Sequence, residues 1–265
     1  NISLLNNYLT ALDMRTITHE MAAIFGAKIP HVVAFIPTGT TSNPEIQRIM
    51  RFKSRLETIV DFVNNSYLPD VITVAKAYPQ YFKIGKSVEN YLCYGAFREK
   101  DGDTYLKPGA LIGGVLEDFS HEYVTEDVGS SYYSNRSGLH PYESETKADP
   151  EKSGAYSWIK APRYKRNVMQ VGPNARFMIQ HRKQVNLEYV KFVENILKEL
   201  GLKVDDLNSV MGRHLVRAVE CKFVAERSLE WTNQLKPGEA SSTEFEIPKE
   251  GRGFGCMEGP RGSLG

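Results

Sequence analysis

The chain has 265 residues, of which 41% are hydrophobic and 25% charged, an ordinary balance for a globular protein with a sizeable core. Its 33 basic and 32 acidic residues leave a net charge of +1, which gives no electrostatic reason to expect nucleic acid or an anionic membrane as partner. No apolar run reaches the roughly 18 residues of a membrane-spanning helix, and no basic region precedes an apolar one at the start, so neither a transmembrane segment nor an export signal is expected.

The first elements along the chain are predicted to be a helix and a short strand. From Met14 to Phe25, apolar residues recur at helical spacing, and Gly26 is expected to act as the C-cap. Val32–Pro37 is β-branched and apolar and is followed by turn-forming residues, which indicates a strand and a turn.

Two further helices are predicted next. One runs from Pro44 to Asn64, because proline suits the first helical turn and Asn43 can cap it. The other, shorter helix covers Pro69–Ala77.

The middle of the chain, from Lys83 to about Arg163, is rich in Gly, Ser and Tyr and has no sustained periodicity. Short strands are predicted over Tyr105–Gly114 and Glu122–Val128, and the rest is expected to be loop that wraps a larger body or a partner. Helices are predicted over Asn186–Leu200, with Gly201 as C-cap, and over about Ser209–Leu235. The expected class is α+β and mostly helical, with long helices, short strands and a loop-rich middle, in a single, partial domain over residues 1–265.

The cysteines argue against a self-contained metal site. Cys93, Cys221 and Cys256 are far apart and form no Cys-x-x-Cys pair. An odd and sparse set of this kind predicts packed or surface thiols rather than a disulfide scaffold or a zinc or iron–sulfur site.

Three short motifs are candidates for a chemical role. His19-Glu20 lacks the second histidine of a zinc protease, since Ala23 stands there, so structural hydrogen bonds are the favoured interpretation. The glycines of Gly251–Gly255 fit no dinucleotide fingerprint and predict instead that the backbone passes close to something bulky. Arg261 lies between Pro260 and Gly262; a surface arginine in a salt bridge is the default interpretation of that string.

Several strings in order are similar to the large subunit of nickel–iron hydrogenases. They are Arg15, His19-Glu20-Met21, Phe25-Gly26-Ala27-Lys28-Ile29-Pro30-His31, Tyr81-Phe82, Gly138-Leu139-His140-Pro141, Tyr156 to Tyr164, Gly172-Pro173, Arg176, Gly212-Arg213-His214 and Glu258-Gly259-Pro260-Arg261-Gly262. The chain departs from the family pattern at Ala27 and Thr38, where glycine is usual, and at Gly259, where alanine is usual. A residue other than glycine costs about 1 kcal/mol where the backbone has a positive φ.

The resemblance implies reversible oxidation of dihydrogen, with electrons leaving to a small subunit that carries iron–sulfur clusters. It implies that Arg261, approached through Pro260, overhangs the open position of a nickel–iron centre, and that His31 and Lys28 face the first iron–sulfur cluster. His31 would there tune the cluster or simply make an interface hydrogen bond. The family holds its metals with two Cys-x-x-Cys pairs that lie outside this central piece, so no metal ligand and no bound metal are expected within it.

Two alternatives stay open at this point. One is a relative of the quinone-site subunit of respiratory complex I, which shares the fold and a Pro-Arg-Gly string but has no Phe-Gly-x-Lys-x-Pro-His string. The other is a scaffold without metals. A cytoplasmic location and a periplasmic location with membrane association through a partner are both compatible with the sequence.

Overall fold

The computed structural model describes residues 2–265, and contacts divide the chain into two compact units. The first unit is Asn1–Pro79 with Arg217–Lys249, and the second is Gln80–Val216 with Glu250–Gly265. Helices and short strands are both present and the middle is rich in loops, which confirms the α+β class. The single domain expected from the sequence stays a prediction.

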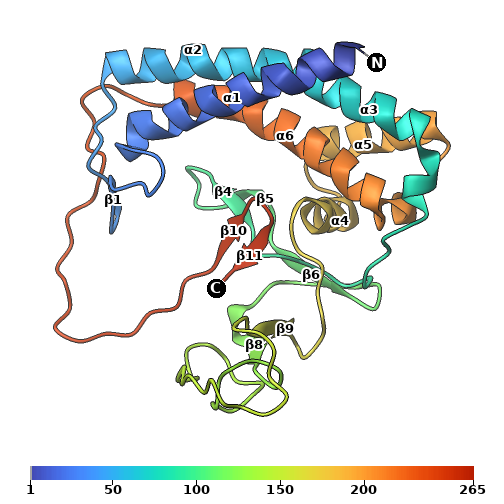
Figure 1. Ribbon diagram of the computed structural model, residues 1–265. Helices are drawn as coiled ribbons and strands as arrows, with labels where there is room; N and C mark the ends of the chain where they lie inside the picture. Colours follow the sequence, from blue (N-terminus) through green and yellow to red (C-terminus); the bar gives the residue numbers. More distant parts are fainter. Residues whose placement is uncertain (1) are drawn as a thin grey trace. The chain divides into compact units, whose positions relative to one another are not determined.

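The first unit is helical and carries one small hairpin (Figure 1). Its elements are α1 (Ile2–Gly26), β1 (Phe35–Ile36), β2 (Gly39–Thr40), α2 (Ile46–Phe62), a π-helical turn (Val63–Tyr67), α3 (Leu68–Ala77) and the part of α6 (Val210–Asn233) from Arg217 onward. The two blue helices of Figure 1, α1 and α2, pack against each other, and Met21 and Leu56 are buried there.

Helix α1 begins at Ile2, so the predicted start at Met14 was wrong. The apolar residues before Met14 are interleaved with Asn6 and Asn7, which hid the helical pattern in the sequence. Asn7 nevertheless serves the packing of the helix, because its amide donates a hydrogen bond of 2.9 Å to Asp70 on α3.

Helix α2 begins at Ile46, and Asn43 does not cap it. Glu45 occupies the N-cap position without a side-chain cap bond, while the Asn43 side-chain oxygen accepts a hydrogen bond of 2.7 Å from Ser241. The side chain of Asn43 is therefore engaged by a distant segment and not by its own helix.

The two helices predicted over 44–64 and 69–77 are continuous. The π-helical turn Val63–Tyr67 carries α2 into α3, and Pro69 lies in the first turn of α3. Because the helix is continuous, Pro69 removes one backbone N–H from its hydrogen-bond ladder, and the π-helical turn lies directly before it.

The second unit combines small antiparallel sheets with helices. Its elements are β3 (Tyr91–Cys93), β4 (Ala96–Arg98), β5 (Thr104–Leu106), β6 (Gly109–Ile112), β7 (Val115–Glu117), β8 (Val124–Asp127), β9 (Ala161–Tyr164), α4 (Pro173–Lys183), α5 (Leu187–Leu200), the first turns of α6, β10 (Met257–Gly259) and β11 (Gly262–Leu264). Strands β3, β6 and β7 form one sheet, and the other strands pair as β4–β5, β8–β9 and β10–β11. A core of Leu92, Ala110, Val124 and Tyr164 lies among these sheets.

Helix α4 was missed in the sequence because its first eight residues, Pro173–Gln180, are all buried. It packs against β3, β6 and α5, and its polar residues Asn174, Arg176 and Gln180 are as buried as Phe177 and Ile179. A helix of this kind has no amphipathic stripe to reveal it.

The loop-rich middle holds more strands than predicted. The single strand expected over Tyr105–Gly114 is two strands, β5 and β6, separated by Lys107 and Pro108. Proline lacks the N–H that a continuous ladder needs. Strand β8 confirms the prediction over Glu122–Val128, and Gly201 caps α5 with φ 68° as expected. Within residues 2–265, no helix is long and apolar enough to cross a membrane.

Candidate functional site

The candidate catalytic arginine lies on a tight hairpin turn of the second unit. Strands β10 and β11 pair Met257 with Leu264 and Gly259 with Gly262, so Pro260 and Arg261 form the two-residue connection between them. Both residues are exposed. Proline fixes one backbone angle of the turn, and the hairpin pairing limits the rest.

A buried arginine from α4 holds this turn from beneath. Arg176 Nη1 donates to Glu258 Oε2 at 2.8 Å and to the carbonyl oxygen of Gly259 at 3.0 Å, and its Nη2 donates to the carbonyl oxygen of Pro260 at 3.0 Å. The exposed fractions of the Arg176 and Glu258 side chains are 3% and 1%. The guanidinium thus binds three successive residues, the last of which precedes Arg261, and fixes where the turn lies.

The second oxygen of the Glu258 carboxylate is also occupied. Its Oε1 accepts hydrogen bonds from the backbone N–H of Tyr94 at 2.7 Å and from the Ser263 hydroxyl at 2.5 Å. A buried carboxylate with both oxygens satisfied and a charged partner is well compensated for its lost hydration. Burial raises the pKa of the Tyr94 hydroxyl above its ordinary value, and Cys256 and Glu258 add to that effect.

Two glycines let the backbone of the turn lie against the start of α4. A Cβ on Gly172, whose φ is 91°, would stand 2.5 Å from the carbonyl oxygen of Arg261. One on Gly262 would stand 2.2 Å from a methyl group of Val171. A Cβ on Gly253 or Gly255 would meet none of the described atoms within 4 Å, so the close backbone approach predicted for Gly251–Gly255 is not found within this chain at those two glycines and stays a prediction.

Lys28 and His31 lie in the loop after α1, in the first unit. Both are exposed. Ala27, with φ 70°, and His31, with φ 60°, are left-handed, and the Val33 N–H donates a hydrogen bond of 3.1 Å to the Gly26 carbonyl. The left-handed residue that ends α1 is therefore Ala27, and not the predicted Gly26.

Glu20 behaves as a structural residue, and for His19 this role stays a prediction. The Glu20 carboxylate accepts from both Nε and Nη2 of Arg55 on α2 at 2.9 Å, which links the two helices. His19 is exposed on α1.

The residues described do not by themselves fit a nickel–iron centre. Among residues 2–265, no three His, Cys, Asp or Glu side chains converge as a metal site. Cys93 is buried, Cys221 exposed and Cys256 half-buried, and none of the three forms a disulfide. Thiolate pairs, which soft metals prefer, are not available here.

The sequence did not reveal the roles of Arg176, Glu258 and Gly172. Each stands in a string that resembles the hydrogenase large subunit, but periodicity gave no sign that α4 exists or that β10 pairs with β11. The one local signal in the sequence is Arg176, a charged residue that closely follows Gly172-Pro173, where a helix can begin.

Comparison with known proteins gives a consistent result. The family model for nickel-dependent hydrogenases matches residues 1–265. The periplasmic [NiFeSe] hydrogenase large subunit of Desulfomicrobium baculatum is 38% identical over 98% of this chain and 52% of its own length. The uptake hydrogenase large subunit of Rhizobium leguminosarum is 30% identical over 100% of this chain and 53% of its own.

Comparison with solved structures gives the same result as comparison of sequences. A [NiFeSe] hydrogenase structure from D. baculatum superposes with a TM-score of 0.88 at 37% identity and covers 98% of this chain and 54% of its own. The enzyme from D. vulgaris Hildenborough in its reduced state gives 0.87 at 32% identity, over 97% of this chain and 55% of its own. The chain thus spans about half the length of these relatives.

Proposed function

This chain belongs to the nickel-dependent hydrogenase family, and from that membership we propose that it is part of a hydrogenase large subunit. The parent protein would oxidise dihydrogen reversibly to two protons and two electrons. The electrons would pass to a partner small subunit that carries iron–sulfur clusters. Because the residues described here offer no donor set, the sulfur ligands of the nickel–iron centre would come from parts of the large subunit outside these 265 residues.

Arg261 is the residue of this chain to which we assign a part in the chemistry. A guanidinium stays charged at all physiological pH values, so its role is that of a fixed cation rather than a base. A cation held beside dihydrogen polarises the H–H bond and favours its heterolytic cleavage, and it needs no reorganisation if it is already in position. Pro260 restricts the backbone that delivers it.

The single observation that carries this proposal is the support beneath the turn. The buried Arg176 binds Glu258 and the carbonyl groups of Gly259 and Pro260, yet the Arg261 side chain is left exposed. A surface arginine that has no functional role does not need a buried ion pair to fix its backbone. This arrangement is what a preorganised electrostatic group requires.

For His31 and Lys28 we propose a place at the contact with the small subunit. Their exposure in the loop after α1 supports this, since both side chains are accessible to a partner. His31 would donate a hydrogen bond to a sulfur atom or a ligand of the nearest cluster and so tune its potential, or would bond the partner backbone.

We propose a periplasmic location, for which the printed name of the D. baculatum relative is the support. Any membrane association would be through a partner. Fractionation of the native host, with the hydrogenase detected by antibody, tests this.

The proposal for Arg261 is tested with Arg261→Lys in the intact enzyme. Lysine keeps the charge but not the planar donor geometry, so turnover in dihydrogen uptake should fall at least about tenfold while nickel content stays normal. Arg252→Lys, an exposed arginine in the same C-terminal segment, is the matched control and should keep full turnover. Unchanged uptake in Arg261→Lys would rule the role out.

A further inference from the structure

A short segment that follows α6 lies along the β1–β2 hairpin of the first unit. This strap, residues 237–243, forms no helix or strand of its own. The Thr40 N–H of the hairpin donates a hydrogen bond of 2.9 Å to the carbonyl oxygen of Ser241. A Cβ on Gly39 would stand 2.1 Å from that same oxygen, so the strap lies directly against the hairpin backbone.

Two hydroxyl groups attach the strap to the hairpin and to the loop that follows it. The Thr38 hydroxyl donates to the carbonyl oxygen of Thr243 and accepts a hydrogen bond of 3.2 Å from the Thr243 N–H. The Ser241 hydroxyl lies 2.7 Å from the Thr40 carbonyl oxygen and 2.7 Å from Asn43 Oδ1, and both oxygens accept from it. These five residues, Thr38, Thr40, Asn43, Ser241 and Thr243, form the latch.

Thr38 holds its side of the latch in a backbone conformation that costs free energy. Its φ of 72° lies in the left-handed region, which a β-branched residue rarely adopts. A glycine here would remove the strain but would have no hydroxyl group to offer. The two hydrogen bonds to Thr243 are therefore what the strained threonine provides.

The strap begins at a turn that can serve as a hinge. The Glu239 N–H donates a hydrogen bond of 3.3 Å to the Lys236 carbonyl oxygen, and Pro237 and Gly238 lie between them. Proline followed by a glycine with φ 84° is the pattern of a type II turn. After Thr243, residues 244–253 are exposed and in no helix or strand. The hydrogen bonds that attach the strap are thus those of this turn and of the latch.

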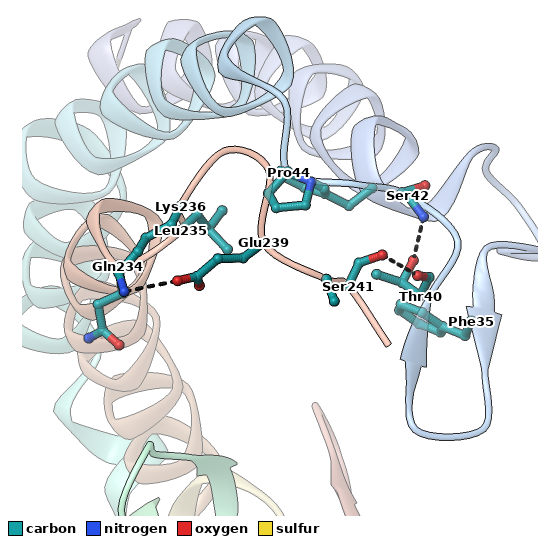
Figure 2. Close-up of a pocket in the computed structure, with 11 residues that line it drawn as sticks. Phe35, Thr40, Ser42, Pro44, Gln234, Leu235, Lys236, Glu239 and Ser241 are labelled. Atoms are coloured by element: carbon teal, nitrogen blue, oxygen red, sulfur yellow. Dashed lines mark hydrogen bonds and ion pairs between the residues drawn. The ribbon is translucent and has the colours of Figure 1, made fainter. Parts of the chain in front are cut away.

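The strap forms one wall of an apolar hollow. The hollow has a volume of about 340 Å³ and is bordered by the strap at Glu239–Ser241. Figure 2 shows Phe35 of β1 and Leu235 around it. Ser42, which also lines the hollow, is only 7% exposed. Movement of the strap away from the hairpin would therefore open the hollow from one side.

The latch is weaker than the helical part of the same unit. Each of its residues is exposed or half-buried, so water can replace a lost partner and each hydrogen bond adds little net free energy. The packing of α1 on α2, in contrast, buries Met21 and Leu56. Release of the strap should therefore need less free energy than unfolding of the unit.

We propose that the strap is a conformational device of the first unit, which turns about Pro237–Gly238 to open and close the apolar hollow, and that Thr38 sets how often it opens. Every contact that carries this inference lies within the first unit. It therefore holds or fails independently of the reaction proposed above.

Amide hydrogen exchange in the full-length protein, resolved to single residues by mass spectrometry, tests the latch. Thr38→Val keeps the shape and the strain of threonine but removes the hydroxyl. The Thr40 N–H should then exchange about tenfold faster, although its own acceptor on Ser241 is not altered. The Leu56 N–H in α2 should exchange as in the wild type. Faster exchange at Thr243 alone would overturn the proposal, because it would report only the bond that was removed.

Three further variants separate release of the strap from the loss of a single bond. Thr38→Ser retains the hydroxyl and should exchange as the wild type does. Ser241→Ala should speed exchange at Thr243, whose bond to Thr38 it leaves intact. Thr58→Val removes an exposed hydroxyl that bonds within α2 and should leave Thr40 unchanged. Faster exchange at Thr40 in Thr58→Val would contradict a specific role for the latch.

Opening of the hollow is measured with Ser42→Cys and iodoacetamide, which forms a sulfur–carbon bond with release of iodide and a proton. Labelling at position 42, mapped by mass spectrometry, should become about tenfold faster when Thr38→Val is added, in step with the exchange of Thr40. Thr58→Val in the same background should leave the labelling rate unchanged. Equal labelling rates with and without Thr38→Val would show that the strap does not control access to the hollow.

Discussion

At the scale of single residues, the backbone conformation of Ala27 is the clearest departure from what the residue type prefers. Ala27 ends α1 with φ 70°, a conformation that glycine adopts freely and alanine does not. Thr38, with φ 72°, is similar at the tip of the β1–β2 hairpin. Both are positions where the hydrogenase large subunits that the sequence resembles usually have glycine, and the positive φ angles give the physical reason.

Ala27→Gly should therefore stabilise the protein by about 1 kcal/mol, because the strain at φ 70° is removed. The thermal midpoint of unfolding should rise by a few degrees. The control is Ala22→Gly in the interior of α1, where the same change should lower stability by about 1 kcal/mol. A fall in the midpoint for Ala27→Gly would show that alanine is not strained there.

Arg176 is a positioning residue in this account, and Arg176→Lys tests that role. An ammonium cannot span Glu258 and two carbonyl groups as the guanidinium fork does, so the turn should lose its fixed position. The turnover number should fall at least about tenfold while nickel content stays normal. Arg213→Lys, which disturbs a bond to the Gly85 carbonyl oxygen in the same unit, should lower the thermal midpoint without lowering turnover. If Arg176→Lys and Arg213→Lys lowered turnover equally, Arg176 would be a structural residue and not a positioning residue.

At the scale of elements, the helices with one apolar face could be predicted and the buried or very short elements could not. Helices α5 and α6 were found from periodicity, to within a few residues at their ends. Helix α4 escaped because its polar residues are buried too, and strands of three or four residues give too little alternation to detect. The support of the Arg261 turn depends on just these undetected elements, α4 and the β10–β11 pair.

The burial of Tyr91, in the sheet of β3, β6 and β7, should make the free energy of unfolding depend on pH in the alkaline range. Burial of Tyr91 on β3, with Glu89 and Asp205 nearby, raises the pKa of its hydroxyl from 10.0 to about 12. The unfolded chain releases this proton first, so the stability from Tyr91 is fully present below pH 10 and is lost as pH rises to about 12.

Urea unfolding at pH 8 and pH 11 measures this loss. The wild type should lose roughly 1 kcal/mol more over this interval than Tyr91→Phe does. Tyr156→Phe, whose residue is 80% exposed, serves as control and should follow the wild type. Identical losses in wild type and Tyr91→Phe would mean that the buried hydroxyl does not titrate in this way.

At the scale of the whole molecule, the family could be predicted from the sequence but the architecture of the site could not. Arg261, Pro260, Lys28 and His31 came from strings that resemble the family, and the structure assigns the first two to one compact unit and the last two to the other. The contacts of Arg176 with the turn join segments more than eighty residues apart, which no local pattern reveals. Roles beyond placement, including the approach of Arg261 to dihydrogen, stay predictions.

The most direct test of the central claim is the exchange of dihydrogen with deuterated water, measured in the Arg261→Lys holoenzyme. Exchange requires cleavage of the H–H bond but no net transfer of electrons to the small subunit, so it isolates the step in which the fixed cation would act. The account predicts that exchange falls at least about tenfold, in parallel with dihydrogen uptake, while nickel content is unchanged. Exchange at the wild-type rate, whether or not uptake falls, would contradict it.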